Sequence, residues 1–523
     1  MSINMLPLAA PLLLFLAALF ASFRQGRRPP NVVAMAEGSA MLALAIAAGS
    51  LLLLLLQGPG DSALIGWAGM GLSARLDAVS VTMLLLVSFV GWIVLRYSHN
   101  YLDGEARQGA FTGWMCAALA AVLLLVQAGN LVQLLGAWIA TSFALHRLLL
   151  FYPERIGARR AARKKQLFAV LSALFLAGSV LLMSTGLGTT DIASINAMAR
   201  SGDLPWHASA AAGLLAIAAL LKSAQFPTHG WLTEVMEAPT PVSALLHAGV
   251  INAGGFLLIR FADVMLFAPG VLAVLAIIGG FTALFGALVM LTQSAVKTSL
   301  AWSTVAQMGF MILQCGLALF PLALLHIVAH SLYKAHAFLA SGGAVEQVAS
   351  IRRSGPVAIP DGSAVARAFL IALAIYGAIG AAFGLGFGFE HKSPQALALG
   401  AILIFGVAYL LAQGLADAAP HALTTRTAIY ATTAALGYFA LQTAAEWLTA
   451  GVLPATPAPG RLEWTLMALA VLTFGLVAVA QALFPLWAGH PAAAGLRVHL
   501  TNGLYVNAML DRMLGGWAVR KPS

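Results

Sequence analysis

The sequence predicts an all-α polytopic membrane protein with about fifteen transmembrane helices. Three observations carry this prediction. Hydrophobic residues make up 61% of the 523 residues and charged residues only 9%, and the mean hydropathy is +0.90. Uncharged apolar runs recur along the whole chain, and each has roughly the 20-residue length that crosses the hydrocarbon core of a bilayer. This composition excludes an ordinary soluble globular protein.

The apolar runs place the expected spans near residues 6–23, 32–56, 76–97, 111–129, 131–151, 166–187, 206–231, 241–262, 269–292, 300–320, 321–346, 364–388, 394–415, 424–448 and 463–486. In the first run the basic residues follow the apolar stretch, and no A-x-A-like cleavage site stands out. We therefore expect an uncleaved first span.

The formal charge of +10 follows from topology. Most basic residues come after odd-numbered spans: Arg24, Arg27, Arg28, Arg96, Arg107, the run from Arg155 to Lys165, Lys297, Arg352, Arg353, Arg426 and Arg497. By the positive-inside rule this pattern predicts an outside N-terminus and a cytoplasmic C-terminus, and we expect no nucleic-acid partner. The alternative is a docking site for a partner protein on the 152–165 loop, formed by Arg159, Arg160, Arg163, Lys164 and Lys165.

The sequence gives no sign of a metal or nucleotide site. Cys116 and Cys315 lie far apart in apolar runs, as expected of small buried side chains. Neither a Walker A motif nor a GxGxxG turn is present. We expect no metal and no cofactor in this chain.

Titratable groups gather in the stretch from Ala219 to Gly255. It contains Lys222, Pro227, Glu234, Glu237, Pro239, Pro241 and His247. Inserting a lysine at bilayer depth costs roughly 2.5–3.5 kcal/mol of free energy, so we expect this lysine to have a function. Proline removes a helical hydrogen bond and loosens the helix beside these groups. The stretch therefore predicts an ion site beside a broken helix.

A second titratable segment carries His326, His330 and Lys334 at i, i+4 and i+8. This spacing lays them along one helix face over roughly 12 Å. Such a stripe suits proton transfer, which needs short steps between groups that exchange protons near neutral pH. The alternative is three polar groups satisfied by neighbouring helices. His336 points away from this face.

Two more basic groups have alternative readings. Lys297 is either an interfacial anchor or the inner end of the polar path. His146 lies about one turn from the basic loop, where a hydrated histidine is the simpler reading.

Three segments carry a family resemblance: KSAQFPTHGWLTEVMEAPTPVSALLHAGVINAGGFLLIR, VKTSLAWSTVAQMGFM and HSLYKAHAFLASG. Together they resemble the antiporter-like membrane subunits, namely chain 5 of respiratory complex I and the Mrp cation/proton antiporters. The resemblance covers most of residues 70–350. It implies two inverted five-helix repeats, each with a discontinuous helix, and proton or sodium translocation. It also implies that Lys222 is the broken-helix lysine and that His247, His330 and Lys334 continue the polar chain.

The same resemblance divides the chain into four parts: N-terminal helices (1–110), a first repeat broken near 222–241 (111–260), a second repeat (261–415), and C-terminal helices with a cytoplasmic tail (416–523). The chain departs from the family in three places. Trp138 is followed by Ile139 and Ala140 where complex I relatives have a glutamate that pairs with the lysine. Glu234, Glu237 or a hydrated pocket would have to replace that partner. The twelfth span lacks the expected charge, and little chain follows the last span to form a long lateral helix.

These departures and the tail resemble a narrower branch, the membrane subunits of the DAB inorganic-carbon complexes of bacteria. The branch implies a location in the bacterial inner membrane and a cytoplasmic partner, DabA, that resembles a β-carbonic anhydrase with its own zinc. It also implies cation influx coupled to hydration of CO2 to bicarbonate. The rivals are a subunit of a respiratory NADH-quinone oxidoreductase or Mrp-type complex, and a membrane scaffold that conducts no ion. This chain shows no residues for CO2 hydration, so we do not expect it to be an enzyme alone.

Overall fold

The protein is a bundle of long helices in the computed structural model, which describes residues 3–67, 69–202, 204–343, 361–388, 392–414 and 421–514. The long helices are α1 (Ala9–Ser22), α2 (Pro30–Gln57), α3 (Ala78–Tyr101), α4 (Gln108–Val126), α5 (Leu131–Leu149), α6 (Ile156–Leu187), α8 (His207–Lys222), α13 (Pro269–Met290), α14 (Val296–Gly316), α15 (Phe320–Ala340), α17 (Gly362–Phe387), α18 (Pro394–Gly414), α19 (His421–Thr449) and α20 (Arg461–Ala482). Among the described residues, ten helices are long and apolar enough to cross a membrane. The prediction of an all-α polytopic membrane protein is confirmed, whereas the count of fifteen spans and the two repeats stay predictions.

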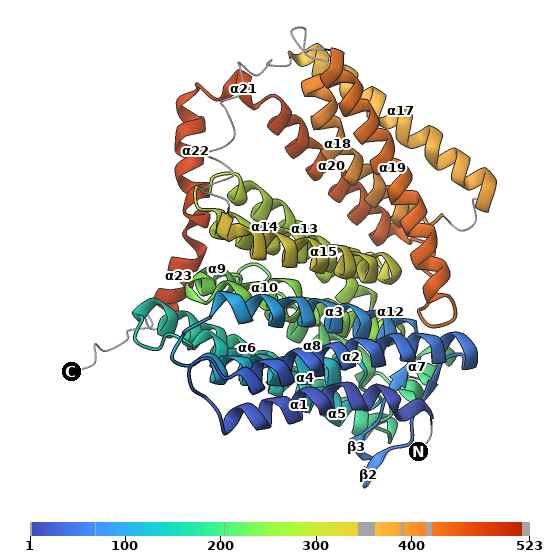
Figure 1. Ribbon diagram of the computed structural model, residues 1–523. Helices are drawn as coiled ribbons and strands as arrows, with labels where there is room; N and C mark the ends of the chain where they lie inside the picture. The colour runs from blue at the N-terminus through green and yellow to red at the C-terminus, as the bar shows by residue number, and fades with distance from the viewer. Residues whose placement is uncertain are drawn as a thin grey trace.

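The long helices form two groups: α1 to α15 run roughly parallel to one another, and α17 to α20 are inclined to them (Figure 1). The larger group, α1 to α15, encloses the main apolar core, in which side chains such as Trp138, Phe256 and Phe338 are fully buried. The smaller group, α17 to α20, packs around its own core with Phe439. Large apolar side chains on the outer helix faces stay exposed, as expected of surfaces that face lipid.

One end of the bundle is closed by two β-ribbons and a short helix, and we call it the hairpin end (Figure 1). Strand β1 (Gly60–Asp61) pairs antiparallel with β4 (Arg75–Leu76), and β2 (Ile65–Trp67) with β3 (Met70–Leu72). Helix α7 (Ile192–Ser201) lies at the same end and begins at Asp191, whose carboxylate accepts from the Ser194 N–H. Residues 188–205 lie between two of the expected spans, and part of this connection is helical.

The opposite end, which we call the basic end, gathers the start of α6 and the C-terminal helices (Figure 1). The basic run belongs to α6, which begins at Ile156, so the expected loop over 152–165 is largely helical. After α20 the chain forms α21 (Phe484–Trp487), α22 (Pro491–Thr501), η6 (Gly503–Tyr505) and α23 (Val506–Met513). Helix α22 descends along one side of the bundle and brings α23 close to α6 (Figure 1).

Helical structure is interrupted three times in the stretch with the titratable groups. Helix α8 ends at Lys222, and helical structure resumes at α9 (Gly230–Glu234) and η2 (Val235–Glu237). Helix α10 (Thr240–Ala248) is then separated from α11 (Ala253–Arg260) by the turn η3 (Val250–Asn252). A short helix α12 (Ala262–Leu266) follows. Helical structure therefore ends at Lys222, as predicted. The break in the helix at η3 was not predicted.

The three prolines of this stretch have different positions. Pro227 lies in the non-helical segment between α8 and α9, as predicted. Pro239 and Pro241 instead flank the start of α10, where a proline costs no helical hydrogen bond. Helical structure is interrupted at Ala238 and Pro239, between η2 and α10, whereas Pro241 lies in the first turn of α10. The twelfth span is also continuous, because α17 has no interruption over its described length.

Candidate functional site

Lys222 lies at the end of α8 and is 6% exposed. Its ammonium donates to the Ser142 hydroxyl at 2.8 Å and sits 4.7 Å from the centre of the Trp138 ring. An aromatic face stabilises a nearby cation in a dry site. Both partners come from α5, the helix in which the sequence lacks the family's glutamate. Lys222 therefore has a neutral hydroxyl and an aromatic ring as neighbours.

Lys165 reaches the same serine from α6. Its ammonium donates to the Ser142 backbone carbonyl at 2.6 Å, and the side chain is 4% exposed. We call Ser142, Lys165 and Lys222 the lysine cluster. The sequence assigned Lys165 to a docking surface, but its burial removes it from any surface.

A signal for this placement was present in the sequence. Lys165, Ser172 and Ser179 are seven residues apart, which places them on one face of a helix. Ser172 donates to the Ala218 carbonyl and Ser179 to the Ala211 carbonyl, so this face packs on α8. The spacing indicates a helix face only because the basic run is the start of α6 and not a loop.

The second set of polar groups centres on His330. Its Nε2 lies 3.0 Å from the backbone carbonyl of His247, and its Nδ1 lies 2.5 Å from the Gln307 side-chain oxygen. His247 Nδ1 lies 3.0 Å from the Thr304 hydroxyl, and the His247 ring stacks on Phe338. The predicted residues His247 and His330 are therefore in direct contact.

Lys334 belongs to the same set. Its ammonium donates to the Ser303 hydroxyl and, at 3.2 Å, to the Leu300 carbonyl. The Thr304 hydroxyl donates to the same carbonyl at 3.0 Å, so Leu300 links Lys334 to the partner of His247. We call His247, Thr304, Gln307, His330 and Lys334 the histidine cluster.

The other members of the predicted stripe lie at its edge. The His326 ring centre is 5.9 Å from that of His330, and the side chain is partly exposed. His336 is exposed, in agreement with its predicted orientation. Lys297 is partly exposed at the first turn of α14.

The turn η3 lies between the two clusters. Among the described residues, no hydrogen bond joins the clusters directly. A cavity of about 10 Å³ on one side is lined by Val250, Lys165 and Lys222. A second cavity of about 10 Å³, on the other side, is lined by Asn252 and Ser331, which are hydrogen-bonded at 2.9 Å. Each space is close to the size of one water molecule.

The two predicted carboxylates do not face Lys222. Glu234 lies 2.9 Å from the ammonium of Lys164, which also binds Asp511 of α23 at 2.6 Å. Asn507 of α23 contacts both Glu234 and Lys164. These four residues, which we call the tail lock, join α6, α9 and α23. Glu237 is largely exposed and lies 3.7 Å from Arg155.

The predicted docking surface is reduced by these contacts. Lys164 is fully buried in the tail lock, and Arg160 lies 2.8 Å from Asp511. Arg160 and Arg163 are exposed, and Arg159 is partly exposed. A surface for a partner at this end would therefore consist of these arginines together with α23.

Three polar residues in or near the clusters were not singled out from the sequence: the partly exposed Gln307 and the buried Asn252 and His229. Gln307 contacts His330 within the histidine cluster, and Asn252 donates to Ser331, the residue that follows His330. His229 is fully buried among Phe226, Phe285 and Trp302, and neither ring nitrogen has a partner among the described residues. Single polar residues in apolar runs give no periodic signal, so only the packing reveals them.

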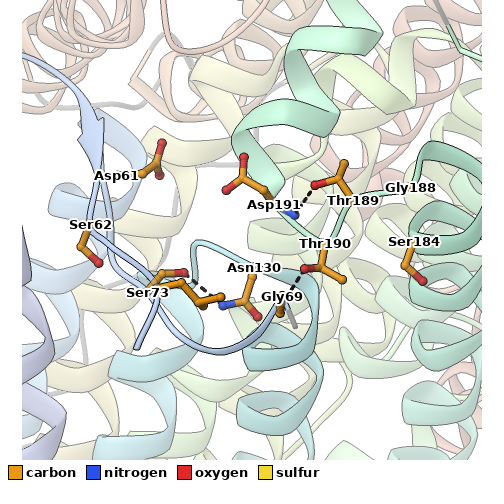
Figure 2. Close-up of a pocket in the computed structure, with 11 residues that line it drawn as sticks. Asp61, Ser62, Gly69, Ser73, Asn130, Ser184, Gly188, Thr189, Thr190 and Asp191 are labelled. Carbon is orange, nitrogen blue, oxygen red and sulfur yellow. Dashed lines mark hydrogen bonds between the residues drawn. The ribbon is translucent and has the colours of Figure 1, made fainter. Parts of the chain in front are cut away.

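A cavity of about 400 Å³ lies at the hairpin end. Figure 2 shows Asp61 and Asp191 on its rim, with Ser73 hydrogen-bonded to Asn130 and Thr190 to the Gly69 carbonyl. Burial raises the pKa of Asp61, and the nearby Asp191 adds to this rise while Arg75 opposes it. No metal-binding group of three His, Cys, Asp or Glu side chains occurs among the described residues.

Comparison with known proteins places these features in a family. The family described as NADH:quinone oxidoreductase/Mrp antiporter, transmembrane, matches residues 128–384, and the one described as complex I chain 5 N-terminus matches residues 66–112. In the structure of the Mrp complex from Dietzia sp., one chain superposes with a TM-score of 0.57 and 26% identity over 98% of this chain and 57% of that chain.

Full-length similarity is found to a protein named probable inorganic carbon transporter subunit DabB2 of Halothiobacillus neapolitanus. The two are 38% identical over 98% of this chain and 93% of that protein. A protein named probable inorganic carbon transporter subunit DabB, of Hydrogenovibrio crunogenus, is 44% identical over 56% of this chain and 57% of its own length. The chain therefore belongs to the antiporter-like family of membrane subunits that includes complex I chain 5 and the Mrp antiporters, in the branch of the DabB proteins.

Proposed function

We propose that this chain is the cation-translocating membrane subunit of an inorganic carbon transporter. Protons, or as second choice sodium ions, cross the membrane through it, and their influx drives hydration of CO2 to bicarbonate by a zinc-containing, carbonic-anhydrase-like partner of the DabA type. The observation that carries the proposal is the pair of buried polar clusters on either side of η3, with one cavity of about 10 Å³ beside the lysine cluster and another of about 10 Å³ at Asn252 and Ser331. The names of the full-length and half-length relatives support the substrate.

Protons would move between the clusters in short steps. A proton that arrives at Lys334 would need water to reach His247 and His330, because the contacts between these groups run through the Leu300 and His247 backbone carbonyls, which accept hydrogen bonds but relay no proton. Transfer past η3 to Lys222 then requires water in the two flanking cavities. We propose that influx starts from the hairpin end, which would face outward in the bacterial inner membrane.

A proton that arrives at Lys222 would place a positive charge in a buried site that has no carboxylate partner among the described residues. Such a charge is costly, and this cost would drive rearrangement of the broken segment 223–239. Glu234 sits at the end of that segment and is held by Lys164 and by Asn507 of α23. The tail lock would thus transmit the movement to α23 and to a partner docked at the basic end, which would face the cytoplasm.

The test uses the complex of this chain with its partner in proteoliposomes. The variant Lys222→Ala should abolish cation flux and inorganic-carbon-dependent growth while the complex still assembles. Lys392→Ala is the matched control, because Lys392 is a partly buried lysine at Thr443, outside both clusters. Full growth rescue by Lys222→Ala would contradict the proposal. Absence of flux in the unaltered complex would favour a non-conducting scaffold instead.

A second candidate is a proton-pumping subunit of a respiratory or Mrp-type complex. The match of residues 66–112 and 128–384 to those families favours it. The co-purifying partner distinguishes the two: a zinc protein supports the first proposal, whereas iron–sulfur subunits or further antiporter subunits support the second.

A further inference from the structure

The lysine cluster brings two ammonium groups to one residue. Lys165 donates to the Ser142 carbonyl at 2.6 Å and Lys222 to the Ser142 hydroxyl at 2.8 Å. Both side chains are more than nine-tenths buried. Among the described residues, no carboxylate forms an ion pair with either lysine, and both ammonium groups bind Ser142 instead. Two adjacent buried charges of like sign are stable only if a negative charge compensates them or one lysine gives up its proton.

A cavity adjoins both lysines. It measures about 10 Å³ and is lined by Lys165, Lys222 and Trp231 together with apolar side chains. Trp231 is 4% exposed, and its indole N–H has no acceptor among the described residues. This volume is close to that of a single water-sized particle.

Among the side chains that line this mostly apolar cavity, the polar groups are all donors. An ammonium and an indole N–H can donate hydrogen bonds but cannot accept them. A water molecule there would find acceptors for neither of its hydrogens among these three groups. A monatomic anion accepts from all three and also supplies the missing negative charge.

We propose that this cavity binds one small monovalent anion of the halide class, with chloride as the physiological ion. The anion lies between Lys165 and Lys222, accepts from the Trp231 N–H, and acts as the counter-charge of the lysine cluster. The proposal concerns binding alone, so it stands whether or not cations move through this chain. Bicarbonate has four heavy atoms and is too large for a cavity of this size.

The test measures the melting temperature of the full-length chain in detergent while chloride replaces gluconate at constant ionic strength. A bound anion stabilises the folded state, so we expect a saturable rise of at least about 2 °C. Trp231→Phe removes only the N–H and should raise the half-saturating chloride concentration by roughly tenfold, the effect of about 1.4 kcal/mol. Lys165→Met should abolish the rise.

Trp92→Phe is the matched control. Its indole N–H is also buried without an acceptor among the described residues, but it lies in α3 beside a different cavity. This variant should keep the half-saturating concentration of the unaltered chain. Bromide scatters anomalously, and a bromide peak between Lys165 and Lys222 would locate the ion directly.

Three results would overturn the proposal. The first is no saturable chloride effect in the unaltered chain, which is the result expected if both lysines are neutral. The second is an unchanged half-saturating concentration in Trp231→Phe, which decides the matter even if Lys165→Met fails to fold. The third is stronger stabilisation by bicarbonate than by chloride, which would contradict the size of the site.

Discussion

The imidazole of His330 donates from Nε2 to the backbone carbonyl of His247 at 3.0 Å. A carbonyl only accepts, so Nε2 carries a proton in every charge state of this contact. Nδ1 faces the Gln307 amide at 2.5 Å. The amide can offer its oxygen to a protonated Nδ1 or, after rotation, its nitrogen to a deprotonated one. Gln307 is therefore suited to follow the protonation of His330.

The first prediction concerns this amide. Gln307→Leu removes the group that adapts to both states of His330, and a lost hydrogen bond to a charged group costs roughly 1.5–3 kcal/mol. Cation flux in proteoliposomes should fall by roughly tenfold or more. Gln314→Leu, on the same helix and with a buried side-chain oxygen that lacks a partner among the described residues, should leave flux near that of the unaltered protein. Equal flux in both variants would contradict a role for Gln307.

The second prediction separates the two sides of α15. Lys334 is fully buried at Ser303 and Leu300, whereas His336 is exposed on the same helix. Lys334→Met should abolish flux, because methionine fills similar space but carries no proton. His336→Ala should keep at least about half of the flux. Flux retained by Lys334→Met would remove this lysine from the path.

The third prediction concerns the tail lock. Lys164→Met leaves Glu234 and Asp511 without their shared cation, and loss of one partner of a buried ion pair costs roughly 3–5 kcal/mol. Thermal unfolding in detergent should show this loss. A double-mutant cycle of Lys164→Met with Asp511→Asn should give a coupling energy of about 1 kcal/mol or more.

Arg512→Ala serves as the control for the tail lock, because Arg512 is exposed beside Asp511. It should change stability by no more than about 0.5 kcal/mol. Additive effects of Lys164→Met and Asp511→Asn would mean that the two side chains do not interact in solution.

The fourth prediction is a pH dependence at the hairpin end. Asp77 begins α3 and lies 2.5 Å from Arg260 and 2.7 Å from Arg75. Burial alone would raise the pKa of Asp77, but Arg260, Arg75 and the Ser80 N–H outweigh it and hold this pKa well below 3.8. A carboxylate with a lowered native pKa stabilises the fold above its unfolded pKa, and this stabilisation is lost as the pH falls toward the native value.

The difference in stability between the unaltered chain and Asp77→Asn should therefore be constant above about pH 5 and shrink as the pH falls below about 4. Melting temperatures from pH 7 to pH 3 measure this difference. Asp103→Asn is the control, because Asp103 pairs with Arg28 at an exposed site. A difference that grows at low pH would contradict the role of the Arg260 pair.

The residue pattern alone predicts the fold class and singles out most of the titratable groups in the two clusters. Apolar runs of bilayer length specify helices in lipid, since every backbone group must be satisfied within the helix. The spacing of His326, His330 and Lys334 placed them on one face of a helix, because a helical face repeats every three to four residues. Lys222 stood out because a charge inside an apolar run is costly.

Which of these titratable groups lie in contact depends on how the helices pack. Glu234 lies twelve residues from Lys222 in sequence, yet it pairs with Lys164 and Asp511, which come from α6 and α23. Lys165 was expected in a surface loop but lies in the lysine cluster. The reason is that α6 already begins at Ile156 and turns the face with Lys165 and Ser172 toward α8. Contacts between helices distant in sequence depend on packing and on how each helix is rotated about its axis, and local residue patterns do not encode these.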